Sequence, residues 1–135
     1  MEKTRCTDDN ILPKLVAALE RLMARTHDTA CVLIEDVGTE KFIQFGRGPD
    51  LILDLPTGGL TADEHKRAAS AFIQLGVDGT RDLEAPDVNG EPITRAFSTY
   101  EYNFSDDSER AAQTAISVFR TTYRLPNATY MLYEN

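Results

Sequence analysis

The stretch Lys-Phe-Ile-Gln-Phe-Gly-Arg-Gly-Pro-Asp-Leu-Ile-Leu-Asp-Leu-Pro (residues 41–56) decides the fold. Residues 41–45 and 50–55 are short segments rich in apolar and aromatic side chains, and the glycines and proline between them are typical of a turn. Successive residues of a strand point to opposite faces. One face of the second segment is therefore purely leucine, whereas its other face carries Ile52 and Asp54. This pattern predicts two antiparallel strands with one buried face.

The residues before this stretch extend the same sheet. Residues 29–36 are apolar and β-branched, and residues 37–40 are a plausible hairpin connection, so we expect three strands in an antiparallel meander. Further upstream, residues 10–26 predict a helix, because one apolar stripe recurs at helical spacing: Leu12, Leu15, Val16, Leu19, Leu22 and Met23.

The residues after it predict two more helices and two more strands. Thr61 and Glu64 form a capping box at the start of a helix that Gly76 can end. Residues 77–92 lack periodicity and predict a long loop or an edge excursion, and residues 93–104 alternate as a long strand. A third helix follows an acidic start at residues 105–109, and residues 128–133 predict a last strand. The expected fold class is α+β, an antiparallel sheet packed with helices in the order α-β-β-β-α-β-α-β.

Length and charge narrow the classes of function. The chain has 135 residues, which suits a single domain over residues 1–135, and residues 1–9 are expected to be flexible. Its net charge of -8 disfavours binding to nucleic acid and docking on anionic membranes. No apolar segment of signal-peptide length follows Met1, so we expect a cytoplasmic location.

Catalytic chemistry has no clear constellation in this sequence. His27 is expected at a helix end and His65 in a solvated first turn, and neither has a Cys or His at metal-ligand spacing. We expect Cys31 to be a buried free cysteine and Cys6 to be an exposed thiol. The glycine pairs lack the spacing of phosphate-binding loops. We therefore expect no catalytic residue, no metal and no cofactor.

Some apolar strand residues are expected on faces that point away from the core. Phe42, Ile52 and Phe97 have polar neighbours on these faces, and Leu12 and Leu15 lie on an apolar edge of the first helix. Scattered apolar residues on the wet face of a sheet are normal. A partner-binding face or groove is the other interpretation of the same residues.

The motif that begins with Phe42-Ile43-Gln44-Phe45 resembles the type III secretion chaperone-like superfamily. It continues through Leu51 to Pro56, Leu60, the helix start at residues 62–64, and Leu75-Gly76. Within that superfamily it is most similar to the TY-Chap and YbjN-like branches of bacterial proteins. One departure concerns the last two helices, because secretion chaperones typically have two strands between them whereas this sequence predicts one.

The resemblance implies a non-catalytic, chaperone-like protein-binding module. It would be a homodimer that holds an extended segment of another protein, such as a secreted effector or toxin. The partner surface would contain Leu12, Leu15, Phe42, Ile52 and Phe97. A rival interpretation is a small-molecule-binding protein or enzyme with a pocket under residues 77–92, using Asp82, Glu84 or His65. A third is an immunity protein that neutralises a toxin.

Overall fold

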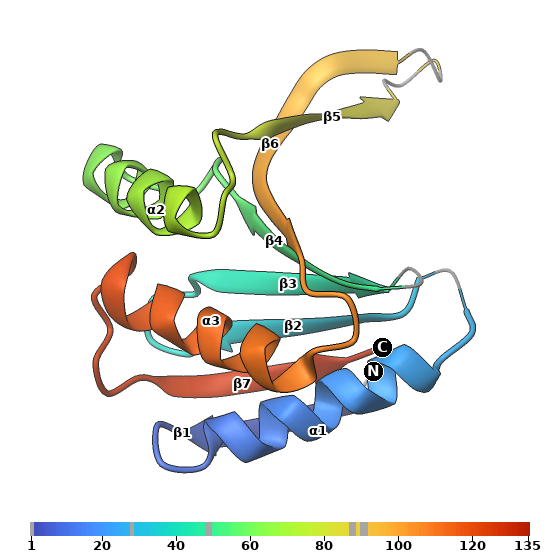
Figure 1. Cartoon of the computed structure of the whole chain (residues 1–135), viewed down its shortest axis with the longest axis vertical. Helices are drawn as coiled ribbons and strands as arrows, with labels where there is room; N and C mark the ends of the chain where they lie inside the picture. Colours follow the sequence, from blue (N-terminus) through green and yellow to red (C-terminus); the bar gives the residue numbers. More distant parts are fainter. Residues whose placement is uncertain (1, 28, 48–49, 87–88, 90–91) are drawn as a thin grey trace.

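Three helices and a seven-stranded antiparallel sheet make up the chain in a computed structural model (Figure 1). The structure describes residues 2–27, 29–47, 50–86, 89 and 92–135, without the side chains of residues 47, 83–86 and 92–97. The elements are β1 (Glu2–Thr7), α1 (Ile11–Ala24), β2 (Cys31–Asp36), β3 (Phe42–Arg47), β4 (Leu51–Pro56), α2 (Ala62–Gln74), β5 (Arg81–Pro86), β6 (Pro92–Asn103), α3 (Ser108–Thr121) and β7 (Thr129–Glu134).

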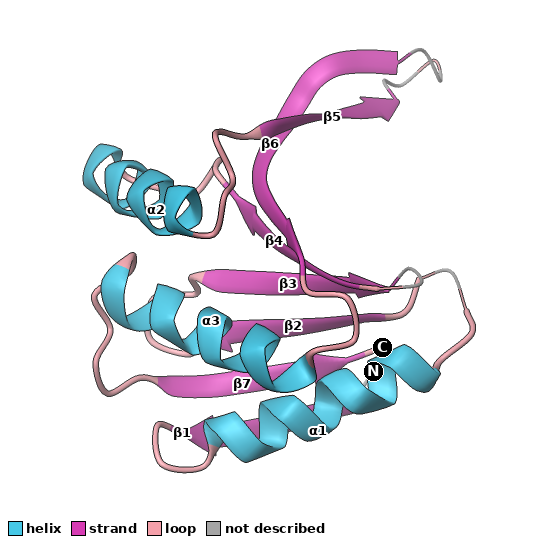
Figure 2. Ribbon diagram, in the orientation of Figure 1, coloured by secondary structure: helices cyan, strands magenta, loops and turns pink. Residues whose placement is uncertain are grey.

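The strands lie in the order β1-β7-β2-β3-β4-β6-β5, and every neighbouring pair is antiparallel (Figure 2). The predicted meander of β2, β3 and β4 is confirmed, and so is the α+β class. The last strand, β7, lies between the first strand and β2. This placement brings the two ends of the sequence together in one part of the sheet, which no local pattern could reveal.

One face of the sheet is covered by helices and forms the core. Figure 1 shows α1 and α3 lying across the strands on the same side. The strand residues that point to this side are buried: Cys6, Val32, Ile34, Ile43, Phe45, Leu51, Leu53, Leu55, Tyr100, Tyr130 and Leu132. Their alternation with less buried neighbours follows from the period of two along each strand. We call this side the covered face.

Helix α1 is anchored to the end of β7 by a buried carboxylate. Glu134 is 4% exposed, and its two carboxylate oxygens accept hydrogen bonds from Nε and Nη2 of Arg21, each at 2.9 Å. Arg25 donates to the same carboxylate at 3.2 Å. These donors lower the pKa of Glu134, the hydrogen bond from Arg21 being the largest cause. The helix is thereby fixed in register over β7.

Helix α2 begins at the predicted capping box. The Thr61 hydroxyl accepts from the backbone N–H of Glu64, and the Glu64 carboxylate accepts from that of Thr61. Gly76 has the left-handed conformation expected after a helix, with φ of +90°. The apolar residues of this helix predict a buried face of Ala68, Ala69, Phe72, Ile73 and Leu75, and this is partly wrong: Ala68 and Phe72 are buried, but Ala69 is exposed and Ile73 is 60% exposed. Helix α2 is thus covered on a narrower stripe than its apolar residues suggested.

Two strands at the edges of the sheet were not predicted. Residues 2–7, expected to be a flexible terminus, form β1, which pairs with β7 along its whole length. Residues 81–86, within the segment 77–92 that was expected to be a long loop or an edge excursion, form the edge strand β5, which pairs with β6 across a register shift between Leu83 and Ala85. Strand β1 is charged and has small inward residues, and strand β5 has an irregular register. Neither strand therefore shows the clear alternation of apolar and polar residues that predicts a strand.

The two cysteines exchange their expected environments. Cys6 is fully buried opposite Tyr130, because its strand turns it toward the covered face. Burial raises the pKa of its thiol. Cys31, expected in the core, is only half-buried, because Val32 and Ile34 take the inward positions of β2. Both thiols are free, and Cys31 is the one on the outer side of the sheet.

Candidate functional site

The candidate site is the side of the sheet opposite the helices, which we call the open face. Its residues alternate with the core residues along each strand and are partly exposed, in contrast to their buried neighbours. Partly exposed apolar side chains form a band across its middle: Cys31, Leu33, Phe42, Ile52, Met131 and Tyr133. Glu35 lies within this band, between Met131 and Phe42. In Figure 2, α1 and α3 lie on the other side of these strands.

One row of cross-strand neighbours shows how the side chains of the open face change from basic to acidic across the sheet. The register places Lys3 beside Tyr133, Tyr133 beside Leu33, Leu33 beside Gln44, Gln44 beside Asp54, and Asp54 beside Glu101 (in strand order β1, β7, β2, β3, β4 and β6). The row therefore begins with a cation, continues through aromatic, apolar and amide side chains, and ends with two carboxylates.

The basic end of the face lies on β1. Lys3 and Arg5 are both exposed, and Nζ of Lys3 lies 5.6 Å from the centroid of the Tyr133 ring, within reach of a cation–π interaction. The Tyr133 hydroxyl donates to Glu35 at 3.3 Å. The Tyr133 side chain is thus held at its ring by Lys3 and at its hydroxyl by Glu35.

The acidic end lies on β4 and β6. Glu101 is satisfied by Arg81 of β5, whose Nη1 donates to both carboxylate oxygens at 3.0 and 3.1 Å. Asp54 lies beside this pair, and its Oδ1 is buried without a hydrogen-bond partner in the part of the chain that the structure describes. Burial, and then the negative charge of Glu101, raise the pKa of Asp54 to about 6. Asp54 is therefore a carboxylate that a further cation would stabilise in its charged form.

A cleft opens where β3 and β4 part, and residues from both sides of the sheet line it. Their pairing ends at Gln44 opposite Asp54, and Pro56, two residues further on, has no N–H to extend it. The Phe42 carbonyl instead accepts from the Tyr123 hydroxyl at 2.8 Å. Burial raises the pKa of Tyr123, which keeps this donor protonated.

The cleft has a volume of about 710 Å³ and both polar and apolar walls. Phe42, Pro56 and Tyr123 supply the apolar surface, and Asp82 lies on its wall. Lys41 also borders it, but its ammonium is paired with Glu64 at 2.6 Å. The main cation of the cleft is thus already neutralised, which makes it a poor site for an anion.

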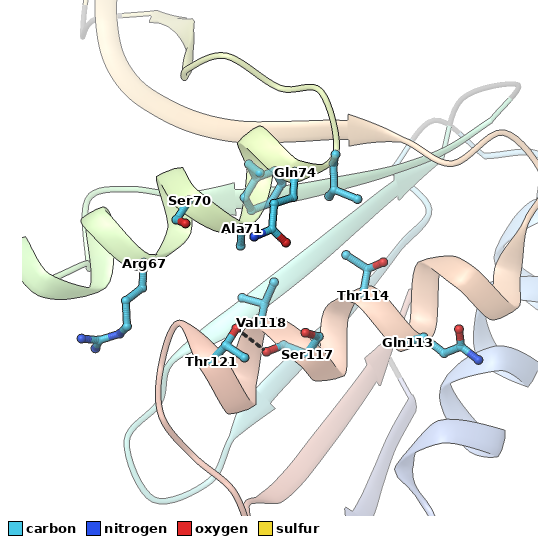
Figure 3. Close-up of a pocket in the computed structure, with 11 residues that line it drawn as sticks. Arg67, Ser70, Ala71, Gln74, Gln113, Thr114, Ser117, Val118 and Thr121 are labelled. Atoms are coloured by element: carbon cyan, nitrogen blue, oxygen red, sulfur yellow. Dashed lines mark hydrogen bonds between the residues drawn. The ribbon is translucent and has the colours of Figure 1, made fainter.

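A second cavity, of about 580 Å³, separates α2 from α3 (Figure 3). Ser70, Ala71 and Gln74 face it from α2, and Thr114 and Ser117 face it from α3. Its walls are neutral side chains, Phe72 and Leu75 among them, apart from Arg67, which donates to the Thr122 carbonyl at 2.9 Å. Nothing in this lining selects a particular ligand.

The structure divides the predicted partner surface between two sides of the molecule. Phe42 and Ile52 lie on the open face, half-buried, as the strand alternation predicts. Leu12 lies among the helices, partly buried, and lines a shallow hollow with Val16. Leu15 is fully buried in the core, which removes its side chain from any exposed surface. The Phe97 side chain lies outside the described residues.

The residues expected for the rival pocket are not brought together. Asp82 lies at the cleft, whereas the Nδ1 of His65 is hydrogen-bonded to the Tyr100 hydroxyl at 3.0 Å and does not border it. The Glu84 side chain lies outside the described residues. Within the described ranges, no group of three or more His, Cys, Asp or Glu side chains could hold a metal ion. Also within these ranges, no helix is long and apolar enough to cross a membrane.

No protein-family model, curated protein sequence or solved structure matches this chain.

Proposed function

We propose that this protein is a non-catalytic protein-binding module that holds an extended segment of a partner protein on the open face. The observation that carries the proposal is the apolar band itself. A sheet face without helices exposes neighbouring apolar side chains on β7, β2, β3 and β4. Contiguous apolar surface rimmed by charged residues is typical of protein-interaction sites.

The order of elements supports the same proposal. Two strands, β5 and β6, lie between α2 and α3, which is the number typical of the secretion chaperones that the sequence resembles. Homodimer formation and a secreted effector or toxin as partner remain part of the proposal.

An extended segment could bind this sheet by adding a strand at its edge or by lying on the open face. The edge strands disfavour strand addition. Edge strand β1 carries the charged residues Glu2, Lys3 and Arg5, and edge strand β5 has a register shift and ends at Pro86. Charges, proline and irregular pairing are the features that block pairing with another strand. We therefore place the partner on the face, where side chains supply the contacts.

The decisive variant is Phe42→Asp. Phe42 is half-buried on the open face, so a charge there should leave the sheet intact but prevent an apolar segment from binding. The measurement is affinity capture from the native cell with wild-type and variant protein, with circular dichroism to check the fold. Loss of the partner from the variant alone is expected.

Two controls bracket this test. Ile73→Asp changes the most exposed large apolar side chain, which lies on α2, and should affect neither fold nor capture. Ile43→Asp changes the next residue of β3, which points into the core, and should unfold the protein. An unfolded Phe42→Asp variant would make Phe42 a core residue, and capture unchanged by it would exclude the open face.

Small-molecule binding in the cleft is a second candidate function. The volume of about 710 Å³ is within the range of ligand pockets, and Asp82 on its wall is one of the residues expected for such a pocket. A small molecule bound there would leave Met131 and Tyr133 unaffected, because neither residue lines the cleft. That difference distinguishes the two functions.

A further inference from the structure

The strand order places unlike charges at the two ends of the row from Lys3 to Glu101. Lys3 lies on edge strand β1, whereas Asp54 and Glu101 lie on β4 and β6. Glu35 and Arg81 do not follow this order: Glu35, on β2 within the apolar band, accepts from the Tyr133 hydroxyl, and Arg81, on β5, pairs with Glu101. A partner that lies along the row therefore meets a cation at the β1 end and Asp54 near the other end.

The contacts at each end determine which charges remain for a partner. Arg81 already neutralises Glu101, and Asp50 accepts a hydrogen bond from Nδ2 of Asn103 at 3.0 Å. Asp54 forms no ion pair among the described residues, although Arg81 lies near enough to lower its pKa in part, and one of its oxygens is buried without a hydrogen-bond partner among them. Within the described ranges Lys3 lies against the face of the Tyr133 ring and forms no ion pair, so its ammonium can still accept a counter-charge.

The strand spacing sets the distance between these two charges. Lys3 on β1 and Asp54 on β4 are separated by four strand intervals in the order β1-β7-β2-β3-β4. At about 4.8 Å for each interval, the separation is about 19 Å. An extended chain covers this in about six residues, at about 3.3 Å per residue. An even number of residues also keeps both end side chains on the same side of the segment.

We propose that the open face binds an extended segment in which an acidic and a basic residue, about six positions apart, flank alternating apolar side chains. The acidic side chain lies over Lys3 and the basic one over Asp54. The apolar side chains between them cover Tyr133 and Leu33. This specificity rests on the proposed function, because it assumes that the open face receives a partner segment.

The test is selection of peptides from a random twelve-residue display library on the full-length protein. Wild-type protein should enrich peptides with the predicted spacing of acid and base around apolar residues. Lys3→Glu should select against the acidic residue, with at least about a fivefold loss of affinity for the wild-type peptides. Asp54→Asn should remove the preference for the basic residue. Lys66→Glu, on an exposed position of α2, is the matched control and should change neither preference.

The outcomes separate this inference from the function on which it rests. Peptides that bind wild type and fail on Phe42→Asp, but show no charge spacing, would overturn the inference and leave the proposed function standing. A library that yields no binders would overturn both. A homodimer in sedimentation that Lys3→Glu and Glu101→Lys each dissociate would show that a second copy covers the face, which also overturns the inference.

Discussion

At the scale of single residues, Asp54 shows how the surroundings of a carboxyl on the sheet shift its pKa. It occupies an outward position of β4, yet burial and the adjacent Glu101 make its charged form costly. Its counterpart in the core layer, Glu134, is more buried but has two arginines as donors, and its pKa is lowered instead. The pKa values of these two carboxyls shift in opposite directions because two arginines donate hydrogen bonds to Glu134, whereas at Asp54 burial and Glu101 outweigh the attraction of Arg81.

Asp54→Asn should stabilise the protein at neutral pH. The folded pKa of about 6 lies above the ordinary value of 3.8, so ionisation of Asp54 opposes folding. The gain in free energy of unfolding should be about 2 kcal/mol above pH 6 and should vanish below about pH 4, where the carboxyl is protonated in both states. Urea denaturation of both proteins at pH 4 and pH 7.5 measures it. Equal stability at both pH values would contradict a raised pKa.

At the scale of elements, local sequence rules worked where the local chain supplies the cause. The capping box of α2, the left-handed Gly76 and the leucine face of β4 each depend on neighbours a few residues away. The same rules found Phe42 and Ile52, because strand alternation alone separates them from the core. They failed for β1, whose inward residues Thr4 and Cys6 are too small to mark a strand.

The rest of the site depends on pairing between distant segments. Met131 and Tyr133 belong to the open face only because β7 inserts between β1 and β2. Lys3 joins it because β1 pairs with β7, so a charged terminal segment becomes the basic edge of a surface. Hydrophobic periodicity sets which residues share a side of a strand, but it does not set which strands are neighbours. The charge polarity of the face was therefore not predictable from sequence.

Helix α1 allows a direct test of the division between core and surface. Leu15→Ala should lower the free energy of unfolding by about 3 kcal/mol, because the leucine is fully buried and its removal leaves a cavity. Leu12→Ala, three residues earlier and only partly buried, should cost about 1 kcal/mol. Chemical denaturation of the two variants compares them. Equal losses would show that α1 packs with a different face toward the sheet.

At the scale of the whole molecule, the helices pack on one side of the sheet, and the other side is the face on which we propose that a partner binds. The net charge of -8 is spread over helix starts, turns and one end of the open face, and not gathered into a metal-binding cluster within the described residues. In the proposed binding mode, negative charge at Asp54 and Glu101 favours a basic residue in the partner, and the β1 edge favours an acidic one. We thus expect the order of charges in a partner segment to decide whether it binds.

The most direct test of this account is methyl NMR of the protein with and without a peptide selected on it. The methyl signals of Leu33, Ile52 and Met131, on three different strands of the open face, should shift together, while that of Ile73 on α2 should not. Shifts confined to Ala71, Leu75 and Val118 would place the peptide in the cavity between α2 and α3 and would contradict the central claim.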